Sequence, residues 1–141
     1  MKIHLVMVGK TKRAEARALF EDYVGRIGRY AEVKCTELRE AGAFQGKKFD
    51  SSAVMVLLDA AGKQWTSAEF AVWLGKQRDG GVRELVFLCG DAEGFPESMR
   101  TAAKVKISLS SLTTAHELAR VMLAEQIYRG FAMLAGHPYP K

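Results

Sequence analysis

Residues 85–90 read Leu-Val-Phe-Leu-Cys-Gly, five apolar side chains in succession followed by a glycine. Two similar runs come earlier in the chain, at residues 3–8 and 53–58. A short apolar run that ends at turn residues is typical of a strand buried on both faces, as in a parallel sheet. Apolar and polar residues alternate at 31–36 and 105–109, which predicts two more strands, the first of them half-buried.

Helical patterns separate these strands. Apolar residues between the first two strands recur at steps of one, three and four, which predicts an amphipathic helix. Thr66 and Glu69 have the spacing of a capping box and predict a helix that continues through Leu74. Pro96 is typical of a first helical turn and predicts a short helix to about Ala103. The first helix is expected to bury Leu19, Phe20, Tyr23, Val24, Ile27 and Tyr30, and the last helix Leu118, Val121, Met122, Tyr128, Phe131 and Ala132.

Strands that alternate with helices imply an α/β fold with parallel strand pairs, and the length of 141 residues fits a single domain, residues 1–141. Residues 39–52 show no clear period, so we expect a loop there. Ligands of such sheets bind beyond the carboxyl ends of the strands. Three predicted strand ends are therefore candidate positions for a site: Leu58-Asp59, Cys89-Gly90 and Leu109-Ser110.

Composition narrows the class of protein. A net charge of +5 and a sequence pI near 9.3 suit a polyanionic partner such as RNA. No apolar run approaches the roughly 20 residues that span a bilayer, so we expect no membrane segment and read the first residues as a strand rather than a signal peptide. Cys35 and Cys89 have no partner at metal-ligand spacing. We expect buried free thiols in a reducing compartment, the cytoplasm, and no metal site.

The motifs of several common enzyme classes fail in this sequence. Gly9-Lys10-Thr11 is similar to the end of a phosphate-binding P-loop, but the glycine required five residues earlier is replaced by His4. No G-x-G-x-x-G follows the first strand, and no G-x-S-x-G occurs. These observations argue against ordinary dinucleotide binding and against a serine hydrolase.

Three short segments at the predicted strand ends remain. They are Leu58–Lys63, Gly90–Gly94 and Ser108–His116, and each is rich in small or polar residues. Small residues let the backbone approach a ligand closely, and exposed N–H and C=O groups can then read the edge of an adenine. Any one of these segments alone is better explained as a turn.

Taken together, the segments resemble the RlmH family of ribosomal RNA pseudouridine N3-methyltransferases, within the SPOUT superfamily of knotted methyltransferases. Their order and spacing match over roughly the C-terminal two-thirds of the chain, and the first strand and helix also fit. The residues that carry the resemblance are Leu58-Asp59-x-x-Gly62-Lys63, Gly90-x-Ala92-Glu93-Gly94, Ser108-Leu109-Ser110-x-Leu112-Thr113, His116, Arg120-Val121, Ala124-Glu125-Gln126, Tyr128-Arg129 and His137-Pro138-Tyr139.

The resemblance implies a parallel-sheet fold with a C-terminal trefoil knot, an exception to the rule against threaded chains. It also implies a homodimer in which each site is completed across the interface. The implied activity is methylation of N3 of a pseudouridine in 23S rRNA, in the stem-loop that faces the small ribosomal subunit, with S-adenosylmethionine as the cofactor. The implied cofactor contacts are Leu58, Gly90, Leu109, Ser110, Ser111, Leu112, Thr113 and Thr114.

A uridine-type imide nitrogen must lose its proton to attack a methyl group well, so a general base is useful. His137 and Tyr139 in the tail are the candidate catalytic residues, and His116 is a weaker one because it also fits the start of a helix. Candidate RNA contacts are His116, Arg120 and Arg129. Nine residues separate the two arginines, which places them on opposite sides of one helix and leaves a phosphate contact and a contact between helices or subunits both open.

The sequence departs from the family pattern at four places. The family usually has a glycine at Asp91, a proline at Ala115 and a histidine at Pro140. It also tends to carry a helix between its second and third strands, for which residues 39–52 look too short. Two other functions therefore stay open: a methyltransferase of this fold acting on another RNA such as tRNA, and a non-catalytic RNA- or ribosome-binding module. For the basic group at residues 10–13, a solvated face and an RNA contact are both open.

Overall fold

The computed structural model describes residues 1–46 and 48–139 and confirms the α/β fold with a parallel sheet. Five strands lie in the order β2-β1-β4-β3-β5, and every neighbouring pair is parallel. The strands are β1 (Lys2–Val8), β2 (Glu32–Leu38), β3 (Val54–Gln64), β4 (Glu84–Cys89) and β5 (Val105–Ser108). The helices are α1 (Ala14–Ile27), the 3₁₀ helix η1 (Ala41–Gly46), α2 (Ser67–Asp79), α3 (Glu97–Ala102) and α4 (His116–Leu134).

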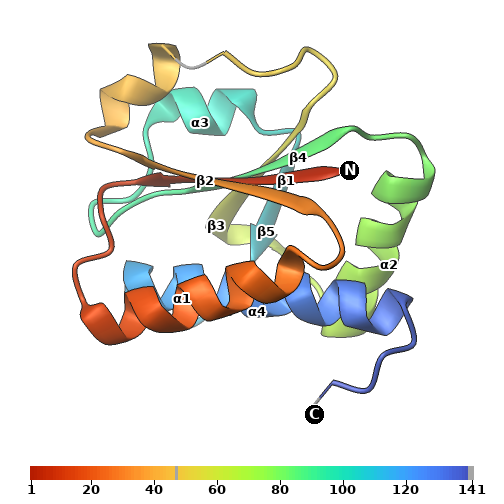
Figure 1. Cartoon of the computed structure of the whole chain (residues 1–141). Coiled ribbons are helices and arrows are strands. Elements are labelled where there is room, and N and C mark those ends of the chain that lie inside the picture. The colour runs from red at the N-terminus through yellow and green to blue at the C-terminus, as the bar shows by residue number, and fades with distance from the viewer. Residues whose placement is uncertain (47, 140–141) are drawn as a thin grey trace.

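Helices cover both faces of the sheet, which is why the central strands read as continuous apolar runs. Figure 1 shows α1 and α4 side by side on one face and α3 on the other. Along β4, Leu85 and Phe87 belong to the cluster under α1, α2 and α4, while Val86 and Leu88 belong to the cluster on the opposite face. Alternate residues of one strand therefore fill two separate cores.

The predicted capping box holds α2 in place. The backbone N–H of Glu69 donates to the Thr66 hydroxyl at 3.1 Å, and the Thr66 N–H donates to the Glu69 carboxylate at 3.2 Å. The short helix predicted after Pro96 is also confirmed, with Pro96 at its N-cap. In the part of the chain that the structure describes, no helix is long and apolar enough to cross a membrane.

Some local predictions were wrong. Residues 39–52 are not all loop, because η1 forms there and buries Phe44 to 6% exposure against the second cluster. Cys35 is exposed on the edge strand β2, whereas Cys89 is buried as expected. Both thiols are free. Three apolar residues assigned to buried helix faces are instead exposed: Leu19, Leu118 and Met122.

Candidate functional site

A cavity of about 280 Å³ lies beyond the carboxyl ends of β4 and β5 and beside the irregular part of β3 that follows Leu58. This is where an open parallel sheet binds its ligands, and the volume is close to the lower end for small-molecule sites, about 300–1,000 Å³. Three segments that are far apart in sequence line it: residues 58–60, residues 89–95, and residues 109–119. The three segments singled out in the sequence thus form one site, although Leu58-Asp59 lies within β3 and not at its end.

Most of the residues expected to contact a cofactor face this cavity. Ser111 does not line it and is exposed. Asp59, Cys89 and Asp91, which were not in the expected set, also line the cavity. The expected residues that do line it are Leu58, Gly90, Leu109, Ser110, Leu112, Thr113 and Thr114.

Side-chain hydroxyls fix the loop that follows β5. The hydroxyl of Ser108 donates to the Ser110 carbonyl at 2.9 Å, and the Leu112 N–H donates to the Ser110 hydroxyl at 2.9 Å. The Thr114 hydroxyl donates to the Leu112 carbonyl at 3.5 Å. Such bonds between serine or threonine and nearby backbone favour turns over regular structure. The loop therefore presents a defined wall to the cavity.

A tight turn follows β4. The backbone groups of Asp91 and Gly94 bond to each other at 2.8 and 2.9 Å, and Asp91 Oδ1 accepts the Glu93 N–H at 2.9 Å. A Cβ atom at Gly90 would lie 2.1 Å from the Gly94 carbonyl oxygen. The glycine at position 90 is therefore required by this turn. Asp91 has no positive φ, so its backbone does not need the family's glycine.

The segment after Leu58 is not a simple turn. Strand β3 continues to Gln64 with an irregularity, since Leu58 and Lys63 both face Ile107 of β5. The Asp59 carboxylate accepts the Ala61 N–H at 2.9 Å and stabilises the excursion. A Cβ at Gly62 would lie 2.7 Å from the Lys106 carbonyl carbon. Gly62 thus allows two strands to approach closely and is not part of the cavity wall.

Cys89 lies at the floor of the cavity and is 3% exposed. Burial raises the pKa of its thiol to about 12. A thiol with this pKa stays protonated at neutral pH and is a poor nucleophile. The site therefore offers no thiolate for covalent chemistry.

The start of α4 forms the rim of the cavity. His116 lines it, with 31% of its side chain exposed, and its Nε2 lies 4.0 Å from a carboxylate oxygen of Glu117. Ala115 precedes the helix with φ −54°. A proline would adopt nearly this φ, so the alanine keeps the backbone that the family's proline favours.

Arg120, expected to contact RNA, lies inside the protein and is 1% exposed. Its guanidinium donates to the Val8 carbonyl at 2.5 Å and to the Thr11 hydroxyl at 3.0 Å. Burial lowers the pKa of Arg120, while the carboxylates of Glu37 and Glu117 act in the opposite direction. This placement corrects the expectation of an RNA contact: Arg120 joins α4 to the end of β1 and the segment that follows it.

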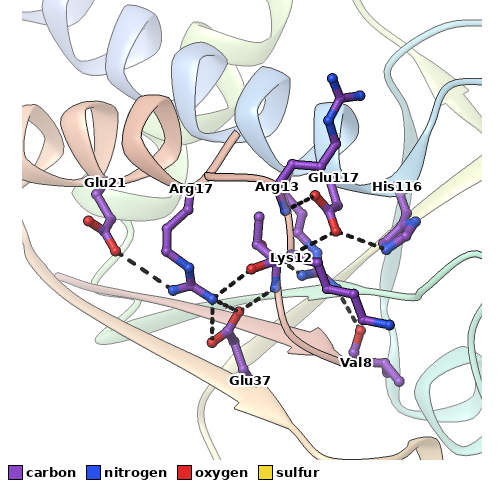
Figure 2. A network of polar contacts seen from close by, with 10 residues as sticks. Val8, Lys12, Arg13, Arg17, Glu21, Glu37, His116 and Glu117 are labelled. Carbon is purple, nitrogen blue, oxygen red and sulfur yellow. Dashed lines mark hydrogen bonds and ion pairs between the residues drawn. The ribbon is translucent and has the colours of Figure 1, made fainter. Parts of the chain in front are cut away.

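Glu117 and Glu37 complete this network, which Figure 2 shows from close by. Glu117 accepts the backbone N–H groups of Lys12 and Arg13 at 2.8 and 3.0 Å. Glu37 accepts the Thr11 N–H at 2.8 Å. Sequence reasoning did not single out either carboxylate. An acidic residue in a first helical turn is the one signal that Glu117 gives, and it is common to many helices.

The other end of α4 holds the remaining candidates. The Tyr139 hydroxyl lies 3.2 Å from the Tyr23 hydroxyl, and its ring packs edge-on against Tyr128 at 4.7 Å between centroids. The Arg129 guanidinium lies 4.6 Å from the Tyr139 ring centroid and pairs with Glu125 at 2.8 Å. Burial, then Tyr23 and Glu125, raise the pKa of Tyr139 above its ordinary value. Tyr139 is thus held against its own chain and stays protonated at neutral pH.

His137 is exposed beyond the end of α4, where its N–H donates to the Ala132 carbonyl at 2.8 Å. The 19 residues of α4 span about 27 Å at roughly 1.5 Å per residue. The cavity contains residues from the first turn of this helix and the tail follows its last turn. The structure therefore does not bring the candidate catalytic residues into the cavity of their own chain. Pro140 lies outside the described residues.

Among residues 1–46 and 48–139, no group of three or more histidine, cysteine or acidic side chains is arranged to hold a metal ion. The polar groups at the cavity are two carboxylates, the His116 imidazole, the Cys89 thiol, hydroxyls and backbone atoms.

A family model described as predicted SPOUT methyltransferase matches residues 1–140. The ribosomal RNA large subunit methyltransferase H of Geotalea daltonii is 41% identical over 151 residues, covering 99% of this chain and 99% of that protein. Proteins of the same name from Solibacter usitatus and Novosphingobium aromaticivorans are 45% and 41% identical and are covered to 99% and 97% of their lengths.

Solved structures share the fold. A probable methylase family protein from Haemophilus influenzae matches 99% of this chain with a TM-score of 0.58 at 6% identity. A putative methyltransferase from Legionella pneumophila, in complex with S-adenosylmethionine, matches 90% of this chain with a TM-score of 0.53 at 15% identity. This chain spans 72% and 65% of those two proteins. At such identities the likeness concerns the fold alone.

The match to the family model runs along nearly the whole chain, and the curated relatives align with it over their full length. The resemblance found in the strand-end segments is confirmed. The chain belongs to the SPOUT methyltransferase family, among the relatives of ribosomal RNA large subunit methyltransferase H.

Proposed function

We propose that this protein transfers a methyl group from S-adenosylmethionine to N3 of a pseudouridine in 23S rRNA, in the stem-loop that faces the small ribosomal subunit. The observation that carries this proposal is the single cavity formed by the three segments that match the family. The curated relatives, named for methylation of large-subunit ribosomal RNA, support the class of substrate.

The cavity has a chemistry that fits this cofactor. Leu58, Leu109 and Leu112 give it apolar walls suited to an adenine ring. Asp59 and Asp91 bring carboxylates to the same cavity, where they favour a cationic ligand such as a sulfonium or an amino group. We assign the eight residues of the expected cofactor set to this site, with Ser111 acting through the conformation of its loop.

S-adenosylmethionine, when bound, supplies a methyl group activated by a neighbouring sulfonium. The protein then has to hold the methyl carbon in line with N3 and to exclude competing geometries. The hydroxyl-bonded loop after β5 and the Asp91–Gly94 turn serve this purpose because their shapes are fixed by internal hydrogen bonds. Such preorganisation lowers the entropic part of the barrier.

The imide proton of N3 needs an acceptor. The pKa of Tyr139 is raised, so this residue is better suited to stacking on a base or donating a hydrogen bond than to accepting a proton. We assign proton removal to His137, whose ring is exposed, or to water that it orients. His116, at the cavity rim, is placed to contact the RNA.

A homodimer would bring the two ends of α4 together. In a two-fold dimer with antiparallel α4 helices, the C-terminal end of one helix lies beside the N-terminal end of the other. Leu112, Leu118 and Met122 are 76%, 49% and 38% exposed near the cavity end, an apolar surface that a second copy would cover. His137, Tyr139 and Arg129 of the partner subunit would then complete each site. Light scattering should show a dimer at micromolar concentration, and a monomer would count against this composite site.

The proposal includes the C-terminal trefoil knot, formed by the segments that line the cavity, and action in the cytoplasm, where ribosomes are assembled. The net charge of +5 supports an RNA partner through counterion release.

The decisive experiment is methyl transfer from labelled S-adenosylmethionine to ribosomes purified from cells that lack this protein, followed by mass spectrometry of the rRNA nucleosides. We expect 3-methylpseudouridine in 23S rRNA. Separate samples contain intact ribosomes, isolated large subunits and tRNA. Label in tRNA alone would replace the proposed substrate, and ribosome binding without any transfer would favour a non-catalytic binding module.

A further inference from the structure

Three cations crowd the segment between β1 and α1. Lys10, Lys12 and Arg13 are exposed. Within residues 1–46 and 48–139, their side chains form no ion pair or hydrogen bond. Unpaired surface cations are common on basic proteins, so their charge alone does not define a site.

The backbone of this segment, in contrast, is held in place by several hydrogen bonds to side chains from other elements. Glu37 accepts the Thr11 N–H at 2.8 Å, and Arg17 donates to the Thr11 carbonyl at 2.9 Å. Arg120 holds the Thr11 hydroxyl at 3.0 Å. Thr11 itself is 7% exposed. The two cations on either side of Thr11 are therefore attached to a buried anchor.

Glu117 fixes the second half of the segment. Each oxygen of its carboxylate accepts one backbone N–H, from Lys12 at 2.8 Å and from Arg13 at 3.0 Å. These two bonds, in that order, lower the pKa of Glu117, so it is ionised at neutral pH. The carboxylate bonds to the backbone of two basic residues, and neither of their side chains pairs with it. Both cations stay available for another partner.

The same glutamate contacts the rim of the cofactor cavity. The neighbouring residue His116 lines the cavity, and its Nε2 lies 4.0 Å from a carboxylate oxygen of Glu117. Figure 2 shows Glu117 between His116 and the backbone of Lys12 and Arg13. One side chain therefore connects the rim of the cavity to the basic segment, although 104 residues separate Arg13 from Glu117 in sequence.

We propose that Lys10, Lys12 and Arg13 form a preformed binding element for the phosphates of the RNA that flank the target nucleotide, and that Glu117 is its positioning residue. This inference rests on the proposed function, since it takes the substrate to be RNA. A fixed backbone reduces the ordering entropy that three long cationic side chains would otherwise lose on binding. Phosphate contacts then set the register of the RNA so that the target base lies over the cavity.

The test measures methyl transfer to ribosomes as a function of salt for the full-length protein. The double variant Lys12→Ala with Arg13→Ala should raise KM for ribosomes about 10-fold and leave kcat within about two-fold, because phosphate contacts supply binding and register. The slope of log kcat/KM against log salt is negative, and its magnitude should decrease by about 0.7–0.9 for each phosphate that the variant no longer neutralises. Affinity for S-adenosylmethionine, measured by calorimetry, should stay unchanged.

The matched control is Arg83→Ala with Lys104→Ala, which removes the same charge. These exposed residues lie before β4 and β5, at the amino ends of the strands and away from the cavity. The control should change KM less than about two-fold and leave the salt slope nearly unchanged. If the two double variants had equal effects, the segment would act only through the net charge of the protein, and the proposal would be overturned.

Glu117→Gln gives a test in which two explanations differ in sign. The substitution adds one unit of net positive charge, which by charge alone should tighten RNA binding. A glutamine has one acceptor oxygen, so one of the two backbone bonds is lost and the segment loosens. The proposal predicts a KM for ribosomes about 5-fold higher, with the fold confirmed by near-UV circular dichroism. An unchanged or lower KM would overturn the positioning role.

The outcome also separates this inference from the proposed function. If the wild-type protein methylates ribosomes while the Lys12/Arg13 variant matches its control, the inference fails and the function stands. If the wild-type protein transfers no methyl group to any ribosomal RNA, the proposed function fails first.

Discussion

Helix α4 carries candidate residues at both of its ends, and the two ends are built in opposite ways. At the start, His116 faces the cavity while Glu117 and Arg120 turn inward and anchor the segment after β1. Beyond the end, Tyr139 rests on aromatic side chains of its own chain and His137 is exposed. The contacts at the first end lie within one chain, whereas no described residue of the second end lines the cavity beyond β4 and β5. This difference supports the proposal that the tail serves the cavity of another subunit.

The largest expected effect comes from removing the second end. Deleting residues 136–141 should lower methyl transfer to ribosomes by about 100-fold or more, the scale of lost general-base and positioning effects. Calorimetry should show that S-adenosylmethionine binds within a few-fold of wild type, because the cavity is at the other end of α4. If the truncated protein transferred methyl groups in single turnovers at a near wild-type rate, the tail would have no role in catalysis.

The deletion becomes sharper in mixed dimers. Chains without the tail, refolded with chains whose cavity is blocked by Gly90→Val, form dimers with one complete site if the site is shared. Random pairing would then restore about a quarter of the wild-type activity. No recovery in a sample that light scattering shows to be dimeric would contradict the shared site.

The second effect concerns the cavity itself. Gly90→Val should weaken S-adenosylmethionine binding by roughly 50-fold, because a Cβ there lies 2.1 Å from the Gly94 carbonyl oxygen and must displace the turn. Gly25→Ala is the control: a Cβ at this position of α1 meets nothing within 4 Å. Calorimetric affinities equal for both variants would show that the turn does not shape the site.

A third comparison sets the two arginines of α4 against each other. Arg120→Met should lower the free energy of unfolding by about 2 kcal/mol, since it leaves the Val8 carbonyl and the Thr11 hydroxyl without their donor. Arg129→Met should lower it by less than about 1 kcal/mol, because its pair with Glu125 is partly exposed. Urea unfolding measures both. The methylation assay should give the opposite order: the folded Arg129→Met variant should lose more activity than the folded Arg120→Met variant. Equal free energies of unfolding for the two variants would contradict the buried role of Arg120.

The smallest effect is a pH dependence at the first end. The pKa of Glu117 is lowered from its ordinary value of 4.5 by the Lys12 and Arg13 N–H groups. A carboxyl group with a lowered pKa stabilises the fold above its ordinary pKa, and this contribution is lost as pH falls through the lowered value. Urea midpoints at about pH 6 and pH 3 should therefore differ more for wild type than for Glu117→Gln. If wild type and Glu117→Gln showed the same pH dependence, the Glu117 carboxylate would not contribute to the stability of the fold.

The sequence was sufficient to predict the cavity because its walls follow buried strands. A run such as residues 85–89 fixes where a strand ends, and parallel strands place their carboxyl ends at one edge. The same reasoning misread Leu118 and Met122, since helical periodicity marks apolar positions without saying what covers them. The extension of β3 past Asp59 was missed because a strand irregularity gives no periodic signal.

The charged network lay beyond sequence reasoning for a different reason. Arg120 reads as an ordinary helical cation, and its burial depends on the Val8 carbonyl and on Thr11, more than a hundred residues away. Buried ions need several partners, and those partners are known only after the chain is folded. The position of Tyr139 relative to the cavity likewise follows from the length and direction of α4.

The exposure of Cys35 and the burial of Cys89 give this protein one accessible thiol for each chain. A maleimide spin label would therefore attach at a single known position on the edge strand β2, and a dimer would report one distance between labels by pulsed electron resonance. Although the residue is exposed, partial burial of its sulfur, with Glu37 and Glu21 nearby, raises the pKa of the Cys35 thiol to about 11, so labelling will be slow at neutral pH and faster as the pH is raised. In a dimer, the two subunits could thus be placed relative to each other without engineering a new cysteine.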